Sequence, residues 1–107
     1  MKLVIAIISD DDCGEVLGAL SKSGLSATRL STTGGFLRSG NSTLLMGVDE
    51  DRLDTVFDIL KEHSSSRKQM ISVTPPIGAI EFVSPPVEIT VGGATAFVVD
   101  VEKFVKL

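Results

Sequence analysis

The apolar and polar positions at the start of the chain predict a strand followed by a helix. Residues 2–8 (KLVIAII) are a continuous aliphatic run, which is typical of a strand covered on both faces. Apolar residues then recur three and four positions apart, as on one side of a helix: Cys13, Val16, Leu17 and Leu20. Three aspartates before this stripe favour the start of a helix, and Gly24 favours its end.

The same unit recurs in the middle of the chain. Residues 25–31 (LSATRLS) alternate between apolar and polar, as a half-buried strand does, and residues 42–48 (STLLMGV) predict another strand. An acidic start again precedes a helical pattern in residues 49–63, whose expected apolar face consists of Leu53, Val56, Phe57 and Leu60. The sequence therefore predicts strand, helix, strand, strand and helix, in that order.

The end of the chain predicts two more strands. Residues 87–91 (VEITV) and 94–100 (ATAFVVD) flank Gly92-Gly93, and adjacent glycines suit the positive-φ positions of a two-residue hairpin turn. We therefore expect an α+β fold, a ferredoxin-like (βαββαβ) sandwich with a C-terminal β-hairpin and then a short helical turn or pairing segment. With 107 residues, the chain is expected to form one domain, residues 1–107, around a single core.

Two long loops are expected in this fold. Residues 32–41 (TTGGFLRSGN) connect the second and third strands, and residues 64–86 separate the second helix from the hairpin. The second loop contains all four prolines, a serine run and several apolar residues, which argue against a flexible linker. Ordered loops of this length in a compact domain usually carry function, so we look for the site there.

Charge and cysteine content limit the partners and the compartment. The formal net charge is −4, so the chain lacks the positive field that attracts nucleic acid or anionic membranes. Its first apolar run is far too short to span a bilayer and does not resemble a secretory leader. A single cysteine, Cys13, agrees with a reducing compartment. We expect a cytoplasmic protein whose partners include neither nucleic acid nor membrane.

Residue chemistry favours binding over catalysis. The sequence contains no nucleophile–base pair, zinc motif or Walker A pattern, so we expect no enzymatic activity. Cys13 lies on the apolar stripe as an inert thiol, and His63 at a helix end favours the helix dipole. The acidic triplets at residues 10–12 and 49–51 suit either divalent metal sites or helix starts, and helix starts are the commoner case. We expect neither a metal nor a cofactor.

The segment TTGGFLRSGN contains groups that suit a nucleotide. The adjacent glycines allow the backbone amides of Gly34, Gly35 and Phe36 to converge on an oxygen anion without side-chain obstruction, which forms an anion nest for phosphate. The preceding threonines are candidate hydroxyl donors. Phe36 offers an aromatic face for a base, and the amide of Asn41 matches the edge of adenine.

The same segment also fits an ordinary long hairpin connection. In that interpretation Phe36 and Leu37 cover an oligomer interface and Arg38 is solvated. Residue spacing alone leaves both interpretations open.

A family resemblance favours the nucleotide. The segments TTGGFLRSGN, STLLMGVDEDRLD and PPVEITVGGATAFV resemble the cyclic di-AMP receptor family of P-II-like signal transduction proteins. The resemblance runs from the first strand to the last hairpin. It implies a homotrimer that binds cyclic di-AMP, a bacterial second messenger, in the clefts between subunits. Binding would rearrange the two long loops and relay the signal to a downstream protein.

The resemblance also implies the ligand-binding residues, with Phe97 closing the pocket from the adjacent subunit. The expected set is Thr28, Gly35, Phe36, Leu37, Asn41, Gly47 and Phe97.

One departure from similar proteins bears on affinity. The chain has Ser26 where similar proteins place an arginine near the phosphates, and losing such a contact costs about 1.5–3 kcal/mol. Arg29 and Lys106 are the candidates to compensate, although Arg29 should point to the opposite face of its strand from Thr28. Two alternatives therefore stay open. One is a P-II-like sensor of ATP or another adenine nucleotide or anion, and the other is a trimeric scaffold without a ligand.

Overall fold

The computed structural model describes residues 1–30, 40–71 and 87–107. Two helices, a single 3-10 turn and six strands make up these parts of the chain. In order they are β1 (Lys2–Ser9), α1 (Asp10–Lys22), β2 (Thr28–Leu30), β3 (Asn41–Val48), η1 (Glu50–Arg52), α2 (Leu53–Ser64), β4 (Arg67–Ile71), β5 (Val87–Val91) and β6 (Ala94–Asp100). The expected α+β class is confirmed.

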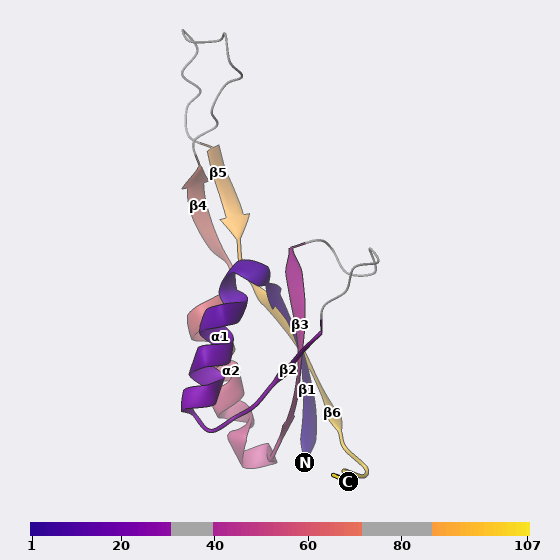
Figure 1. The fold of residues 1–107 in the computed structure, drawn as a ribbon. Coiled ribbons are helices and arrows are strands. Elements are labelled where there is room, and N and C mark those ends of the chain that lie inside the picture. The colour runs from indigo at the N-terminus through magenta and orange to yellow at the C-terminus, as the bar shows by residue number, and fades with distance from the viewer. Residues whose placement is uncertain (31–39, 72–86) are drawn as a thin grey trace, which may run out of the picture.

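The strands form two separate sheets. The main sheet has four strands in the order β2-β3-β1-β6, and every neighbouring pair in it is antiparallel. Strands β4 and β5 pair only with each other in the described residues and project beyond the end of the main sheet (Figure 1). We call this two-stranded ribbon, β4 and β5, the arm.

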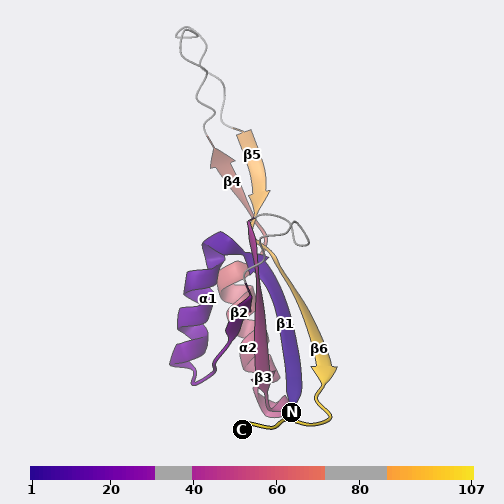
Figure 2. The same ribbon diagram turned by 45° about the vertical axis from the view of Figure 1, so that its right-hand side comes forward.

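Both helices pack against the same face of the main sheet (Figure 2). On β1 the alternation is clear, because Val4, Ala6 and Ile8 are buried under the helices while the residues between them are only half-buried. The expectation that β1 is covered on both faces is therefore wrong for the described part of a single chain. The core consists of Val4, Ala6, Ile8, Cys13, Val16, Leu20, Leu44, Met46, Val48, Val56, Ile59 and Leu60.

The ends of α1 follow from its sequence. Ser9 is the N-cap, and its hydroxyl accepts a hydrogen bond from the backbone N–H of Asp11 at 3.4 Å. Gly24 has a φ of 75°, and the N–H of Leu25 donates to the carbonyl of Leu20 at 2.8 Å. This is a Schellman ending, so the prediction that Gly24 stops the helix is confirmed.

The second helix is less regular at its start. The turn η1 precedes it, and Phe57, expected on its apolar face, is 39% exposed. Ile59 is buried instead, next to Leu60 and three positions after Val56. The helix was therefore predicted correctly, but its buried stripe is rotated by part of a turn. In the described parts of the chain, no helix is long and apolar enough to cross a membrane.

The prediction that residues 87–91 and 94–100 pair as a C-terminal hairpin is wrong. Gly92 and Gly93 have the positive φ values of 75° and 98° that such a turn needs, but they do not join paired strands. They carry the chain from the arm into the main sheet, where β6 pairs with the central strand β1. Strand β5 pairs with β4, which lies inside the segment expected to be a loop. The sequence of β4, RKQMI, shows no clear alternation of apolar and polar residues, and residues 67–70 are all exposed.

The last residues form neither the helical turn nor the strand that the sequence left open. Residues 101–107 contain no regular element, although the N–H of Val101 donates to the carbonyl of Met1 at 3.2 Å. Phe104, Val105 and Leu107 expose their side chains.

Gly92 lies in a crowded position at the base of the arm, which gives a test of this part of the fold. A Cβ atom on Gly92 would lie 2.6 Å from Arg67 Nη1 and 3.0 Å from the Ser65 carbonyl oxygen. Gly24 has the same φ of 75°, but a Cβ atom there would meet nothing within 4 Å. The two positions therefore share the backbone strain and differ only in steric contact.

We expect Gly24→Ala to lower the free energy of unfolding by about 1–2 kcal/mol, the cost of a left-handed alanine. Gly92→Ala should cost clearly more, because the methyl group must also displace Arg67 or the Ser65 carbonyl. Urea unfolding of both variants at one protein concentration measures the difference. Equal losses would contradict the close packing at the base of the arm.

Candidate functional site

The strand register places two of the expected site residues in one row across the main sheet. Thr28 on β2 pairs with Leu45 on β3, Leu45 pairs with Ile5 on β1, and Ile5 pairs with Phe97 on β6. Residues directly opposite in antiparallel strands point to the same face of the sheet. Because Val4 and Ala6 on either side of Ile5 face the helices, this row lies on the face away from them. We call the face of the main sheet that is turned away from the helices the outer face.

Asn41 and Gly47 belong to the same surface. Both are an even number of positions from Leu45 along β3, so they share its side of the strand. The register adds that Asn41 lies opposite Ser9 and Gly47 lies opposite Leu3. The described site residues therefore gather on one face, and all of them are exposed. Gly35, Phe36 and Leu37 lie outside the described residues.

Thr28 and Phe97 occupy opposite edges of the sheet. Strands β3 and β1 lie between them, and strands are about 4.8 Å apart, so their backbones are separated by about 14 Å. Direct contact between the two side chains within one chain is thus excluded. The outer face offers hydroxyl and amide groups at the β2–β3 edge and an aromatic ring at the β6 edge, where Phe97 is 55% exposed.

Gly47 adds no side chain to the outer face. Its backbone does not have a positive φ, and an added Cβ atom would meet only Met1 Sδ, at an ordinary 3.6 Å. Neither its conformation nor its described neighbours require a glycine. The glycine leaves the backbone of β3 open to close approach at this point of the outer face.

Sequence analysis missed Thr43, which lies on the outer face between Asn41 and Leu45. Its residue exposure is 6%, and among the described residues its Oγ1 atom has no hydrogen-bond partner. A buried hydroxyl without a partner is unfavourable by about 1–3 kcal/mol, so this group suits a partner from outside. No sequence signal marks it, because a threonine is ordinary in a strand.

Among the described residues of β2, the basic residue Arg29 points away from the outer face. Arg29 Nη2 lies 3.5 Å from Asp10 Oδ1, at the start of α1, which confirms that Arg29 faces away from Thr28. Arg29 therefore does not take the place of the arginine expected from similar proteins, where this chain has Ser26. At the far end of the sheet, Lys2 and Asp100 form an ion pair. Their hydrogen bond raises the pKa of Lys2 and lowers the pKa of Asp100.

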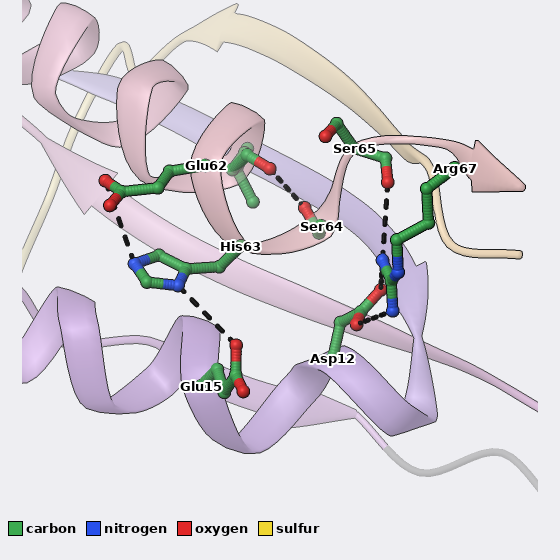
Figure 3. Close-up of polar contacts among 8 residues, drawn as sticks. Asp12, Glu15, Glu62, His63, Ser64, Ser65 and Arg67 are labelled. Atoms are coloured by element: carbon green, nitrogen blue, oxygen red, sulfur yellow. Dashed lines mark hydrogen bonds and ion pairs between the residues drawn. The ribbon is translucent and has the colours of Figure 1, made fainter. Parts of the chain in front are cut away.

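The remaining polar candidates have structural partners on the helical side (Figure 3). His63 Nδ1 lies 3.6 Å from a carboxylate oxygen of Glu15, and its Nε2 lies 3.9 Å from Glu62. Asp12 is bound to Arg67. Within the described residues, no three histidine, cysteine or acidic side chains are grouped to hold a metal ion.

A separate hollow of about 360 Å³ opens between α2 and β6. Its lining includes Phe57, Leu60, Lys61, Ala94 and Ala96, all on the helical side of the sheet. None of the expected site residues lines it. The outer face, not this hollow, is therefore the candidate site.

The fold defines a small α+β protein whose main sheet leaves one face uncovered by its helices. A family model described as cyclic-di-AMP receptor matches residues 1–107, and the chain belongs to this family of receptors. The chain is also similar to a crystal structure of a functionally unknown protein from Pediococcus pentosaceus ATCC 25745. The two are 39% identical with a TM-score of 0.77, over 99% of this chain and 96% of that chain. The resemblance seen in the sequence is thus confirmed.

The unpaired hydroxyl of Thr43 is testable without a ligand. We expect Thr43→Val to leave the free energy of unfolding unchanged or to raise it by up to about 1 kcal/mol, because it removes a buried group that makes no hydrogen bond. Thr95→Val is the matched control, since Thr95 lies in the same row of the sheet but is exposed. Urea unfolding compares the two. A loss above about 1 kcal/mol for Thr43→Val alone would mean that the hydroxyl has a partner.

Proposed function

We propose that the chain is a subunit of a homotrimeric, P-II-like signalling protein that binds cyclic di-AMP in clefts between its subunits. In this proposal residues 1–107 form one ferredoxin-like domain, which the strand order β2-β3-β1-β6 supports. The carrying observation is that Thr28, Asn41, Gly47 and Phe97 all lie on the one sheet face that the helices leave open, with Thr28 and Phe97 at opposite edges.

The apolar character of the outer face supports a neighbouring subunit. Leu3, Ile5 and Ile7 are half-buried there, and Leu30 and Val99 are exposed. A contiguous apolar surface of this kind on a folded chain marks an interaction site. In a cyclic arrangement the β6 edge of one subunit meets the β2 edge of the next, which brings Phe97 to Thr28 of its neighbour.

The chemistry of the face suits cyclic di-AMP. The Asn41 amide carries the donor and acceptor that match an adenine edge, and Phe97 offers a ring on which a base stacks. The hydroxyl of Thr28 suits a phosphate oxygen, and the unpaired hydroxyl of Thr43 supplies one more donor nearby. Gly47 lets the ligand approach the strand closely. Gly35, Phe36 and Leu37 belong to this proposal through the family resemblance.

In this proposal the protein acts in the cytoplasm, and the surface of the ligand-bound trimer binds a downstream protein. The ligand shifts the conformation only as far as it binds one state better than the other. The alternative sensor of ATP or another anion is favoured by one observation, the orientation of Arg29 toward Asp10 and away from the outer face. The ligand-free scaffold is favoured by the apolar rows of that same face.

Isothermal titration separates these functions. We expect saturable binding of cyclic di-AMP, one molecule per subunit, and no comparable binding of ATP or cyclic di-GMP. Asn41→Ala and Phe97→Ala should each weaken binding about tenfold or more, through a lost edge contact and a lost stacking surface. Phe57→Ala is the matched control, because Phe57 belongs to α2 on the helical side and is also partly exposed.

Tighter binding of ATP than of cyclic di-AMP would favour the alternative sensor. No binding of any nucleotide at high micromolar concentration would favour the trimeric scaffold without a ligand.

A further inference from the structure

The first turn of α1 lies between the candidate site and the arm. It follows β1 directly, so the central strand of the sheet fixes its position. Its three residues are Asp10, Asp11 and Asp12. An acidic first turn is favourable to any helix, but two of these carboxylates have specific partners on two different parts of the chain.

Asp10 holds the strand end that carries Asn41. Its backbone N–H donates to the carbonyl of Gly40 at 2.8 Å, and its carboxylate accepts a hydrogen bond from the hydroxyl of Ser42. These two contacts lie immediately before and after Asn41. The same carboxylate oxygen faces Arg29, the neighbour of Thr28, at 3.5 Å. Asp10 therefore touches the residues next to two expected ligand contacts.

Asp12 holds the base of the arm (Figure 3). Its carboxylate is 4% exposed as a residue and receives both guanidinium ends of Arg67, at 2.8 Å from Nη2 to Oδ1 and 3.3 Å from Nη1 to Oδ2. This hydrogen-bonded pair raises the pKa of Arg67 above its ordinary value. Arg67 is the first residue of β4, and its Nη1 also donates to the Ser65 carbonyl at 3.3 Å. A fork of this kind fixes direction as well as distance.

The returning strand of the arm passes the same point. A Cβ atom on Gly92 would lie 3.2 Å from Asp12 Oδ2, and the N–H of Gly93 donates to the Ser64 carbonyl at 2.7 Å. Both ends of the arm are thus packed beside Asp12. Asp11, between the two holding residues, is exposed, and its carboxylate makes no hydrogen bond or ion pair with the described residues.

We propose that the first turn of α1 couples the Asn41 segment to the arm, with Asp10 positioning residues 40–42 and Asp12 positioning Arg67. One short rigid turn bears both attachments, so a shift of either attachment changes the position of the other. The coupling is reciprocal by thermodynamic necessity. The inference rests on the proposed function for the role of this coupling, which is to transmit ligand binding at Asn41 to the arm.

Amide hydrogen exchange on the ligand-free protein tests the coupling itself. Arg67→Gln cuts the arm attachment, and Ser42→Ala cuts the attachment beside Asn41. We expect Arg67→Gln to speed exchange in residues 40–43 by about fivefold or more, and Ser42→Ala to do the same in β4 and β5. Amides in the middle of α2 serve as the internal reference and should not change, which separates coupling from general loss of stability.

Two matched variants serve as controls. Lys68→Gln breaks a second ion pair of the arm, in which Lys68 Nζ lies 3.2 Å from Glu88, but it leaves α1 untouched. Asp11→Asn removes a charge from the same turn without removing a hydrogen bond. Neither should change exchange at the distant segment. Arg67→Lys keeps the charge but loses the fork, and it should restore part of the protection that Arg67→Gln removes.

Effects confined to the mutated segment would overturn the proposal, as would equal effects of Lys68→Gln and Arg67→Gln on residues 40–43. Titration with cyclic di-AMP then adds the link to function. Arg67→Gln should change the affinity by about fivefold or more, while Lys68→Gln leaves it unchanged. If the wild type binds no cyclic di-AMP, the proposed function fails, while the exchange result still decides whether the turn couples the two segments.

Discussion

The uncovered face of the main sheet is the constraint on which the rest of this structure depends. Two helices bury one face, and the described residues include no element that covers the other. Strand β1 is nevertheless apolar on both sides, since Leu3, Ile5 and Ile7 alternate with the buried Val4 and Ala6. The hydrophobic effect therefore favours a second surface against the outer face. The expected ligand residues lie along this same face, so binding and assembly are proposed for one surface.

The helices were predictable from sequence because their periodicity reflects burial on one side. The stripe from Cys13 to Leu20 predicted α1 well, and Gly24 marked its end. Strand pairing was less predictable. Two glycines predict a positive-φ turn, but a turn does not determine which strands pair on either side of it. Strand β6 pairs with the largely apolar central strand β1, and β5 pairs with β4. Residues 67–70 of β4 are exposed on both faces, so β4 carried no alternation.

The candidate site was predictable mainly through the family resemblance, and the register adds what the motif lacks. Residue spacing cannot tell that Thr28 and Phe97 share a row at opposite edges, because strand order decides it. Thr43 was missed because the lack of a partner is a property of surroundings, not of residue type. In the sequence, the acidic first turn of α1 was interpreted as a helix start that favours the helix dipole, in preference to a metal site. That explanation applies equally to Asp11, whereas the structure gives Asp10 and Asp12 separate partners.

Subunit mixing tests the central claim, that one cleft takes Thr28 from one chain and Phe97 from the next. Thr28→Ala and Phe97→Ala chains with different tags would be co-expressed, and assemblies carrying both tags would be titrated with cyclic di-AMP. In a cyclic trimer each mixed assembly contains one cleft with both native residues, so about one cleft in three should bind with wild-type affinity. Assemblies that bind no better than the two single variants would contradict the account, since both residues would then belong to a site within one chain.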